Sequence, residues 1–279
     1  LTSGSFSVAG KIVGMLVGEW VLKHDSDNGN GNGNDESAYL AAEGLHSMLS
    51  QNVKSDNNNN FWRQRVTAGV LPSILGVVNG VNGGAAAAVD HPALIALGGI
   101  ATTLPVSAIF QKYKSTTIVG TLMNSAERIS TSSKCATCVL NALLKLVETV
   151  AEVLGNGDPE QGQSQGQEQE QEQQINQNKA VIFVSENLGR LIHLALKFAV
   201  AEEGGDVGVQ VVALNVLRGV LNCGLRADEN FDLKKYTTLV ELSLGKVIDG
   251  GGNRKLRVKA GGLLCRWVGT GGFGIVPTE

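Results

Sequence analysis

Apolar residues recur along most of the chain with the spacing of an α-helix. One set follows i, i+3, i+4, i+7, i+10, i+11 and i+14 and therefore shares one helix face; it comprises Leu140, Leu143, Leu144, Val147, Val150, Ala151 and Leu154. Three later sets follow similar spacings: Leu188, Leu191, Ile192, Ala195 and Phe198; Val240, Leu244, Val247 and Ile248; and Leu256, Ala260, Leu263, Leu264 and Trp267. No long alternation of apolar and polar residues competes with this period, so the sequence predicts an all-α fold.

Helix boundaries can be recognised ahead of two apolar runs. Asp206 and Asn253 stand where N-cap residues would, just ahead of apolar runs. The glycines at 204–205 and 250–252 are typical of the stops and turns between helices. We therefore expect separate helices joined by short turns in this part of the chain.

Three polar, low-complexity segments interrupt the helical pattern, at residues 25–36, 51–60 and 156–178. They are rich in Asn, Gln or Gly and contain almost no apolar side chains, which is typical of disordered loops. The predicted organisation is an N-terminal helical-repeat section over residues 1–155, a Gln-rich disordered linker over 156–178, a C-terminal helical-repeat section over 179–268 and a Gly-rich tail over 269–279.

The sequence also repeats itself weakly. VQVVALNVL at residues 209–217 and LRVKAGGLL at 256–264 share a small Ala between apolar positions, 47 residues apart, and RVTAGVL at 65–71 partly echoes RVKAG at 257–261. A small residue at a fixed place lets neighbouring helices approach closely. We expect Ala213 and Ala260 to be buried at equivalent helix–helix contacts.

These stretches resemble the armadillo and HEAT repeat families, most closely over residues 180–268 and less closely over 37–155. The resemblance implies a right-handed α-solenoid of stacked helices; an irregular helical bundle is the alternative fold. It also implies a non-enzymatic scaffold that binds a protein or an extended peptide. The alternative function is an enzyme or nucleotide-binding protein whose site is assembled only in space or is truncated.

Two polar stripes are candidates for contact with such a partner. Asn215, Arg218 and Asn222 lie at i, i+3 and i+7 on one predicted helix, and Arg190, His193 and Lys197 have the same spacing on the helix before it. The second stripe could form a basic patch beside Arg218, suited to an acidic partner. The Asn-and-Trp ladder of peptide-binding armadillo proteins has no matching tryptophan here. For both stripes, an ordinary solvated helix face is the favoured interpretation and partner binding the alternative.

Composition and charge narrow the class of protein. The chain has 279 residues, 43% of them hydrophobic, and is therefore long enough to bury a sizeable core. Its net charge of −3 argues against binding nucleic acid through phosphate contacts. The four cysteines lie in apolar helical patterns, which predicts a reducing compartment, the cytoplasm or the nucleus. Because the chain begins with Leu1 rather than Met, this prediction rests on the cysteines alone.

Two motifs suggest chemistry that their context does not support. Cys135 and Cys138 form a C-x-x-C pair. A zinc site would need further ligands, and redox chemistry would need a strand before the helix. We therefore expect both cysteines to be buried structural thiols. GTGGFG at residues 269–274 fits a phosphate-binding loop, yet it lacks the flanking strands or helix that such loops need. We expect no catalytic residue, no metal site and no cofactor.

One apolar stretch reaches the length of a membrane span. Residues 93–110 carry no charge, but Gly98, Gly99 and Pro105 dilute or break the segment. A buried helix or helix-turn is the favoured interpretation and a membrane segment the alternative. No membrane is expected among the partners.

Overall fold

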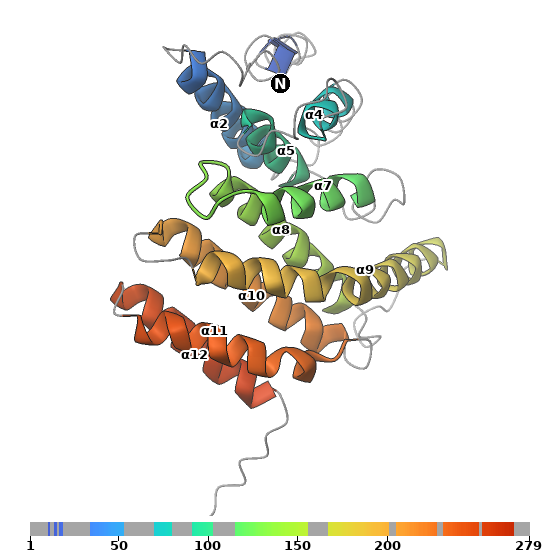
Figure 1. Ribbon diagram of the computed structural model, residues 1–279. Helices are drawn as coiled ribbons and strands as arrows, with labels where there is room; N and C mark the ends of the chain where they lie inside the picture. Colours follow the sequence, from blue (N-terminus) through green and yellow to red (C-terminus); the bar gives the residue numbers. More distant parts are fainter. Residues whose placement is uncertain are drawn as a thin grey trace, which may run out of the picture. The chain divides into compact units, whose positions relative to one another are not determined.

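The computed structural model describes residues 34–52, 70–79, 91–102, 115–155, 167–200, 205–227, 231–250 and 253–270, together with Lys11, Gly14, Met15, Val17 and Gly18. Helices account for nearly all of these residues, and no strand occurs among them (Figure 1). The prediction of an all-α fold is confirmed for this part of the chain.

The main elements are α2 (Asn34–Asn52), α4 (Leu71–Val78), α5 (Pro92–Thr102), α7 (Ser115–Arg128), α8 (Ala136–Gly155), α9 (Gln167–Ala199), α10 (Val207–Ala227), the 3-10 helix η4 (Leu233–Tyr236), α11 (Thr237–Asp249) and α12 (Arg254–Thr270). They belong to two compact units, Leu1–Leu143 and Leu144–Glu279, whose boundary falls within α8.

Helix α5 is the centre of the first unit. It packs against α2, α4 and α7, and every residue from Pro92 to Ala101 is buried. This burial confirms the buried-helix interpretation for the described part of the apolar stretch at residues 93–110. Residues 103–110, including Pro105, lie outside the described residues.

Two adjacent glycines allow the helices around α5 to approach closely. A Cβ atom on Gly99 would stand 2.8 Å from the Cα of His46 in α2, and one on Gly98 would stand 3.1 Å from the carbonyl oxygen of Cys138 in α8. Real Cβ atoms almost never stand 2.8 Å from another heavy atom, and 3.1 Å is tighter than most real Cβ contacts. The absence of side chains at Gly99 and Gly98 therefore lets α2 and α8 pack this closely against α5.

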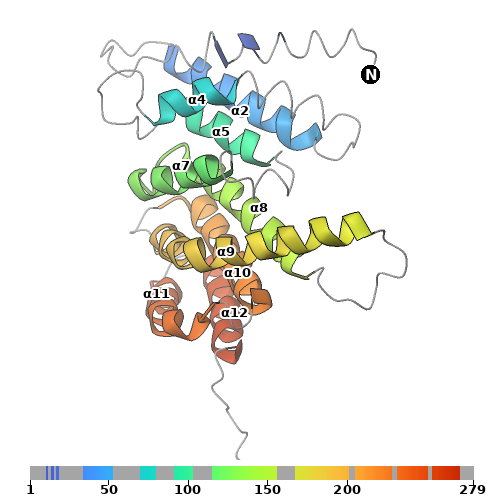
Figure 2. The same ribbon diagram turned by 90° about the vertical axis from the view of Figure 1, so that its right-hand side faces the viewer.

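The second unit contains two antiparallel helical hairpins, α9–α10 and α11–α12 (Figures 1 and 2). In the first hairpin, the buried Gln210 near the start of α10 donates from Nε2 to the carbonyl oxygen of Ala199 at the end of α9, over 3.4 Å. This bond satisfies one of the carbonyls that a helix C-terminus leaves without an intrahelical partner. The N-terminal part of α9 extends beyond the end of α10 in both views.

Helix α10 runs parallel to both α8 and α12. Gly219 of α10 lies against Leu144 and Val147 of α8, and farther along both helices Arg226 donates to the carbonyl oxygen of Ala151. Helix α10 also contacts α12, where Arg266 donates to Asn222 Oδ1 over 3.2 Å. Because residue numbers rise together along α8 and α10, these two helices run in the same direction.

The 47-residue repeat is visible in the local structure of α10 and α12. Asp206 Oδ1 accepts a hydrogen bond from Gly208 N at 2.7 Å, and Asn253 Oδ1 accepts one from Lys255 N at 2.9 Å. Both residues are therefore N-caps, as predicted. Positions that are 47 residues apart are also buried in pairs: Val209 with Leu256, Ala213 with Ala260, Val216 with Leu263, and Val220 with Trp267. The predicted burial of Ala213 and Ala260 is confirmed.

The connection between α10 and α11 crosses both helices of the first hairpin at glycines. A Cβ on Gly224 of α10 would stand 2.8 Å from a methyl carbon of Leu233, and one on Gly189 of α9 would stand 3.0 Å from Cζ of Tyr236. Asp232 caps the 3-10 helix by accepting from Lys234 N at 3.0 Å. The two glycines thus provide the space that the side chains of η4 fill.

Helices extend into four segments whose composition predicted loops or a tail. Helix α9 begins at Gln167, inside the segment predicted to be a disordered linker, and α2 covers the edges of the two earlier low-complexity segments. Gln and Glu are good helix formers, so a polar run can continue a helix that packs farther along. Helix α12 runs through Thr270, and the rest of the predicted tail, residues 271–279, lies outside the described residues.

We expect Arg226→Met to lower the free energy of unfolding of the second unit by about 0.5–1 kcal/mol, because the C-terminal end of α8 loses a cationic donor. The long apolar Met side chain keeps most of the packing beside Gly155, which lies directly under the guanidinium. Urea unfolding would measure the change. Arg218→Met removes a cation from the same helix without touching α8; an equal loss in both variants would contradict the capping role.

Candidate functional site

The predicted stripe on α10 lies partly against α12 and partly in solvent. Arg218 is exposed, while Asn215 and Asn222 are half-buried. Asn222 is held by its hydrogen bond from Arg266, and the Oδ1 atom of Asn215 is buried without a hydrogen-bond partner. The three residues do share one side of the helix, but only Arg218 projects fully into solvent.

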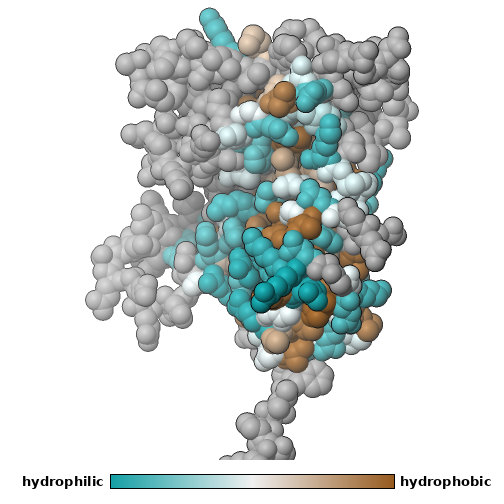
Figure 3. All heavy atoms as spheres, turned by 90° about the vertical axis from the view of Figure 1, so that its left-hand side faces the viewer, coloured by the Kyte–Doolittle hydropathy of each residue, from teal (hydrophilic) through white to brown (hydrophobic). Residues whose placement is uncertain are grey.

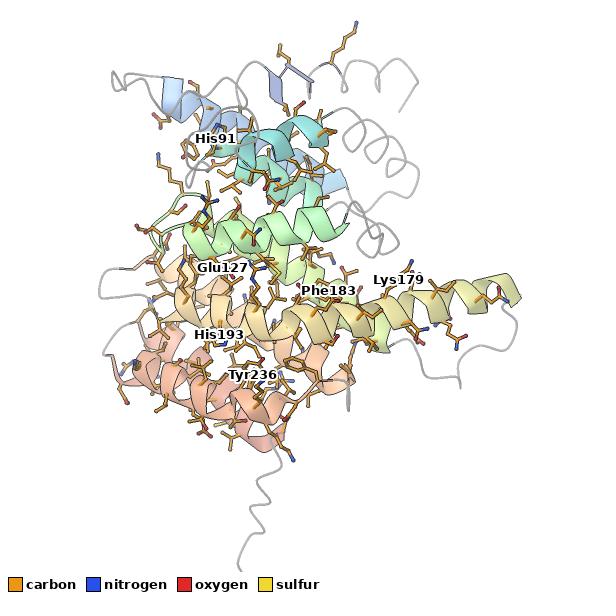
Figure 4. The ribbon with its side chains drawn as sticks, turned by 45° about the vertical axis from the view of Figure 1, so that its right-hand side comes forward. His91, Glu127, Lys179, Phe183, His193 and Tyr236 are labelled. Carbon is orange, nitrogen blue, oxygen red and sulfur yellow. The ribbon has the colours of Figure 1, made fainter. Side chains whose placement is uncertain are left out.

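The stripe on α9 lies beside η4. His193 is exposed and its ring meets the ring of Tyr236 edge-on, with centroids 6.1 Å apart (Figure 4). Lys197 is also exposed, and its Nζ lies 5.0 Å from the ring centroid of its neighbour Phe198. Arg190 is half-buried. Part of this stripe therefore helps to hold the connection between the two hairpins.

Within the described residues, the stripe on α10 contacts α12, whereas the stripe on α9 contacts η4. Arg218 lies close enough to Lys259 of α12 to affect its pKa. Burial lowers the pKa of Lys259 below the usual value for a lysine, and the positive charges of Arg218 and Lys255 add to this effect. A cationic cluster thus lies where α10 meets α12. We call Arg218, Lys255, Lys259 and Arg266 the basic face.

Three members of the basic face, Lys255, Lys259 and Arg266, were not among the residues predicted from the sequence. Their spacing of i, i+4 and i+11 on α12 places them on one side of that helix. This spacing is visible in the sequence, but it gains meaning only once α12 is known to pack beside Arg218.

The histidines have structural surroundings in the described part of the chain. His91 Nδ1 accepts a hydrogen bond from Ala93 N at 3.0 Å and so caps α5. His46 packs on Gly99, and burial lowers its pKa against the opposing effect of Glu43. His193 contacts Tyr236. Among the described residues, no group of three or more His, Cys, Asp or Glu side chains could hold a metal ion.

All four cysteines are free thiols. Cys135 is buried, and its thiol donates to the carbonyl oxygen of His91 over 3.5 Å. Cys138, one helical turn later, is half-buried. Burial, with a smaller contribution from Glu43, raises the pKa of Cys138 to about 11. Burial also raises the pKa of Cys223 to about 12. A raised pKa leaves little of the nucleophilic thiolate at neutral pH.

We therefore expect Cys265, which is exposed, to react first with iodoacetamide at pH 8, and Cys138 and Cys223 to react at least tenfold more slowly. Peptide mass spectrometry over a time course would measure the order. The urea-unfolded chain serves as the control, because there all four thiols should react at similar rates. Rapid labelling of Cys138 in the folded protein would contradict the burial of this thiol.

Helix α10 is the one described helix long and apolar enough to cross a membrane by length and composition, and more than half of its most apolar stretch is buried within the protein. A helix in the core of a protein can meet the same criteria of length and composition. Large exposed apolar side chains are spread over different helices, among them Leu40, Ile182, Leu242 and Val258. The coloured surface in Figure 3 mixes hydrophilic and hydrophobic side chains rather than presenting one continuous apolar area.

Comparisons with known proteins returned no relative: no family model, no curated protein and no solved structure matches this chain.

Proposed function

We propose that this chain is a non-enzymatic scaffold that binds a protein or an extended peptide on an armadillo/HEAT-like, right-handed α-solenoid. The observation that supports this most strongly is the repeated hairpin of the second unit. Its second helices, α10 and α12, have N-caps 47 residues apart and the same buried positions relative to those caps. A stack of equivalent hairpins is the basic unit of solenoid proteins.

This arrangement suits an elongated ligand. When successive second helices lie side by side, their solvent-facing strips form one surface that crosses several helices, and such a surface matches a segment of extended chain. Arg218 and Asn222 on α10 lie on this kind of strip, beside Lys259 and Arg266 of α12. The free thiols favour the cytoplasm or the nucleus as the place where the protein acts.

A peptide-display selection on the folded, full-length chain tests the proposal. We expect random dodecapeptides to be enriched, to bind in solution and to slow amide hydrogen exchange in α10 and α12. The urea-unfolded chain is the control target. If the selection returns only peptides that bind both targets equally, or none, the scaffold function is contradicted.

A further inference from the structure

Helices α10 and α12 concentrate positive charge in a chain that is acidic as a whole. Neither helix contains Asp or Glu, and together they contain seven cations: Arg218, Arg226, Arg254, Lys255, Arg257, Lys259 and Arg266. The net charge of the whole chain is −3. The excess of cations on these two helices is therefore a local feature and not a consequence of the overall composition.

Four of these cations form the basic face where α10 meets α12. Arg218, Lys255 and Arg266 are exposed and Lys259 is half-buried. Arg266 is fixed by its hydrogen bond to Asn222, which lies one turn beyond Arg218 on α10. The face consequently includes side chains from two helices, and at least one of its guanidinium groups is held in position.

The described residues do not neutralise this cluster. Within them, none of the four cations has an ion pair with a carboxylate, and the like charges of Arg218 and Lys255 both act on Lys259. Like charges at such positions repel one another, so an anion placed among them would be attracted by several cations at once. A bound anionic partner would reduce the repulsion between these cations.

We propose that the basic face binds an acidic, extended segment of a partner protein. This proposal rests on the proposed scaffold function and specifies the surface and the chemistry of the ligand. The net charge of −3 disfavours nucleic acid as the ligand. Because the cations are spread over two helices rather than converging on one point, a segment with several carboxylates fits better than a single small anion.

The dimensions of the basic face agree with such a segment. Lys255 and Lys259 are one helical turn apart, about 6 Å along the axis, and Arg266 lies about 16 Å from Lys255. In an extended chain, alternate residues point the same way and are about 7 Å apart. A segment with Glu or Asp at every second position can therefore present successive carboxylates to successive cations.

The test uses a fluorescein-labelled decapeptide of alternating Glu and Ser, titrated with the full-length chain at 50 mM NaCl and followed by fluorescence anisotropy. We expect saturable binding that weakens as the salt concentration rises. The triple substitution R218Q, K255Q and K259Q should weaken binding at least tenfold. All three side chains are partly or fully exposed, so the variant is expected to fold, and far-UV circular dichroism checks this.

A matched control separates this specific face from general charge attraction. The substitutions K246Q, R254Q and R257Q remove the same charge from exposed positions of the α11–α12 hairpin outside the basic face. They should change the affinity less than twofold. Equal losses in the two triple variants, no binding by the native chain, or tighter binding of a ten-nucleotide single-stranded DNA would each overturn the proposal.

Failure here is distinguishable from failure of the scaffold function. If display selection yields peptides that bind the folded chain but are not acidic, and that bind the R218Q, K255Q and K259Q variant normally, the scaffold function stands and the basic face is not its site. If no peptide binds the folded chain, both proposals fail.

Discussion

Replacing Ala213 or Ala260 with arginine is expected to lower the free energy of unfolding of the second unit by about 4 kcal/mol or more. Both side chains are fully buried, at 0% exposure, and each lies seven residues after the N-cap of its helix. An arginine at either position would place a charge and a long side chain in packed space without a partner. Urea unfolding, with hydrogen exchange in α10 and α12 as the local readout, would measure the loss.

The substitution V258R is the matched control, because Val258 lies on α12 only two residues from Ala260 and is 68% exposed. It should change stability by less than about 0.5 kcal/mol. The repeat alignment also requires A213R and A260R to have effects of similar size. If either variant unfolds like the parent chain, the two positions are not equivalent packing points.

Replacing Gly99 with alanine is expected to destabilise the first unit by about 2–3 kcal/mol. The added methyl group would stand 2.8 Å from the backbone Cα of His46, so α2 and α5 would have to separate. Overpacking against backbone is costly because the contact cannot be relieved by a side-chain rotation. Faster hydrogen exchange across Pro92–Thr102, together with a lower urea midpoint, would report this separation.

The substitution G44A tests the same chemistry where space is available. Gly44 lies on α2, and a Cβ there would have nothing within 4 Å. Alanine is the better helix former, so this variant should be stabilised by up to about 1 kcal/mol. If G99A were also neutral or stabilising, α2 and α5 would not be packed through Gly99 as described.

The helices of the second unit could be predicted because their signals are local. The apolar face of α9 at Leu188, Leu191 and Ile192 and the N-caps Asp206 and Asn253 each depend on residues a few positions away. Hydrophobic period and capping act at that range, so the sequence alone was sufficient for them.

The glycine contacts could not be predicted in the same way. In the sequence, Gly98 and Gly99 only weaken an apolar stretch, and Gly189 and Gly224 appear as unfavourable residues inside helices. Their purpose depends on which backbone or side chain approaches them, namely His46, Cys138, Tyr236 and Leu233. That information is tertiary, and a single sequence contains no direct signal for it.

Only part of the candidate site could be predicted, because its other residues come together through tertiary packing. The stripe of Asn215, Arg218 and Asn222 follows from helical spacing, but its partners on α12 are about 40 residues farther along the chain. Arg266, for example, is 44 residues from Asn222, to which it donates. Each cation of α12 alone resembles an ordinary solvated residue, and only the packing of α12 on α10 brings the four together.

The Gln-rich segment illustrates how two sequence signals can disagree. Its lack of apolar residues predicted disorder, whereas Gln and Glu favour helix, and α9 begins at Gln167 within that segment. Extending an existing helix is easier than nucleating one, so these polar residues can continue the well-packed portion of α9.

The central claim is that α10 and α12 stack in parallel as the second helices of successive hairpins, and cross-linking tests it most directly. In a Cys265→Ser background, the substitutions N222C and R266C place thiols on side chains that are in contact. The pair N222C and R254C places them about 18 Å apart along the helix axis. A short bismaleimide should join the first pair, detected as a mass shift, and leave the second pair unjoined. Efficient cross-linking of N222C to R254C, without cross-linking of N222C to R266C, would contradict the parallel stack.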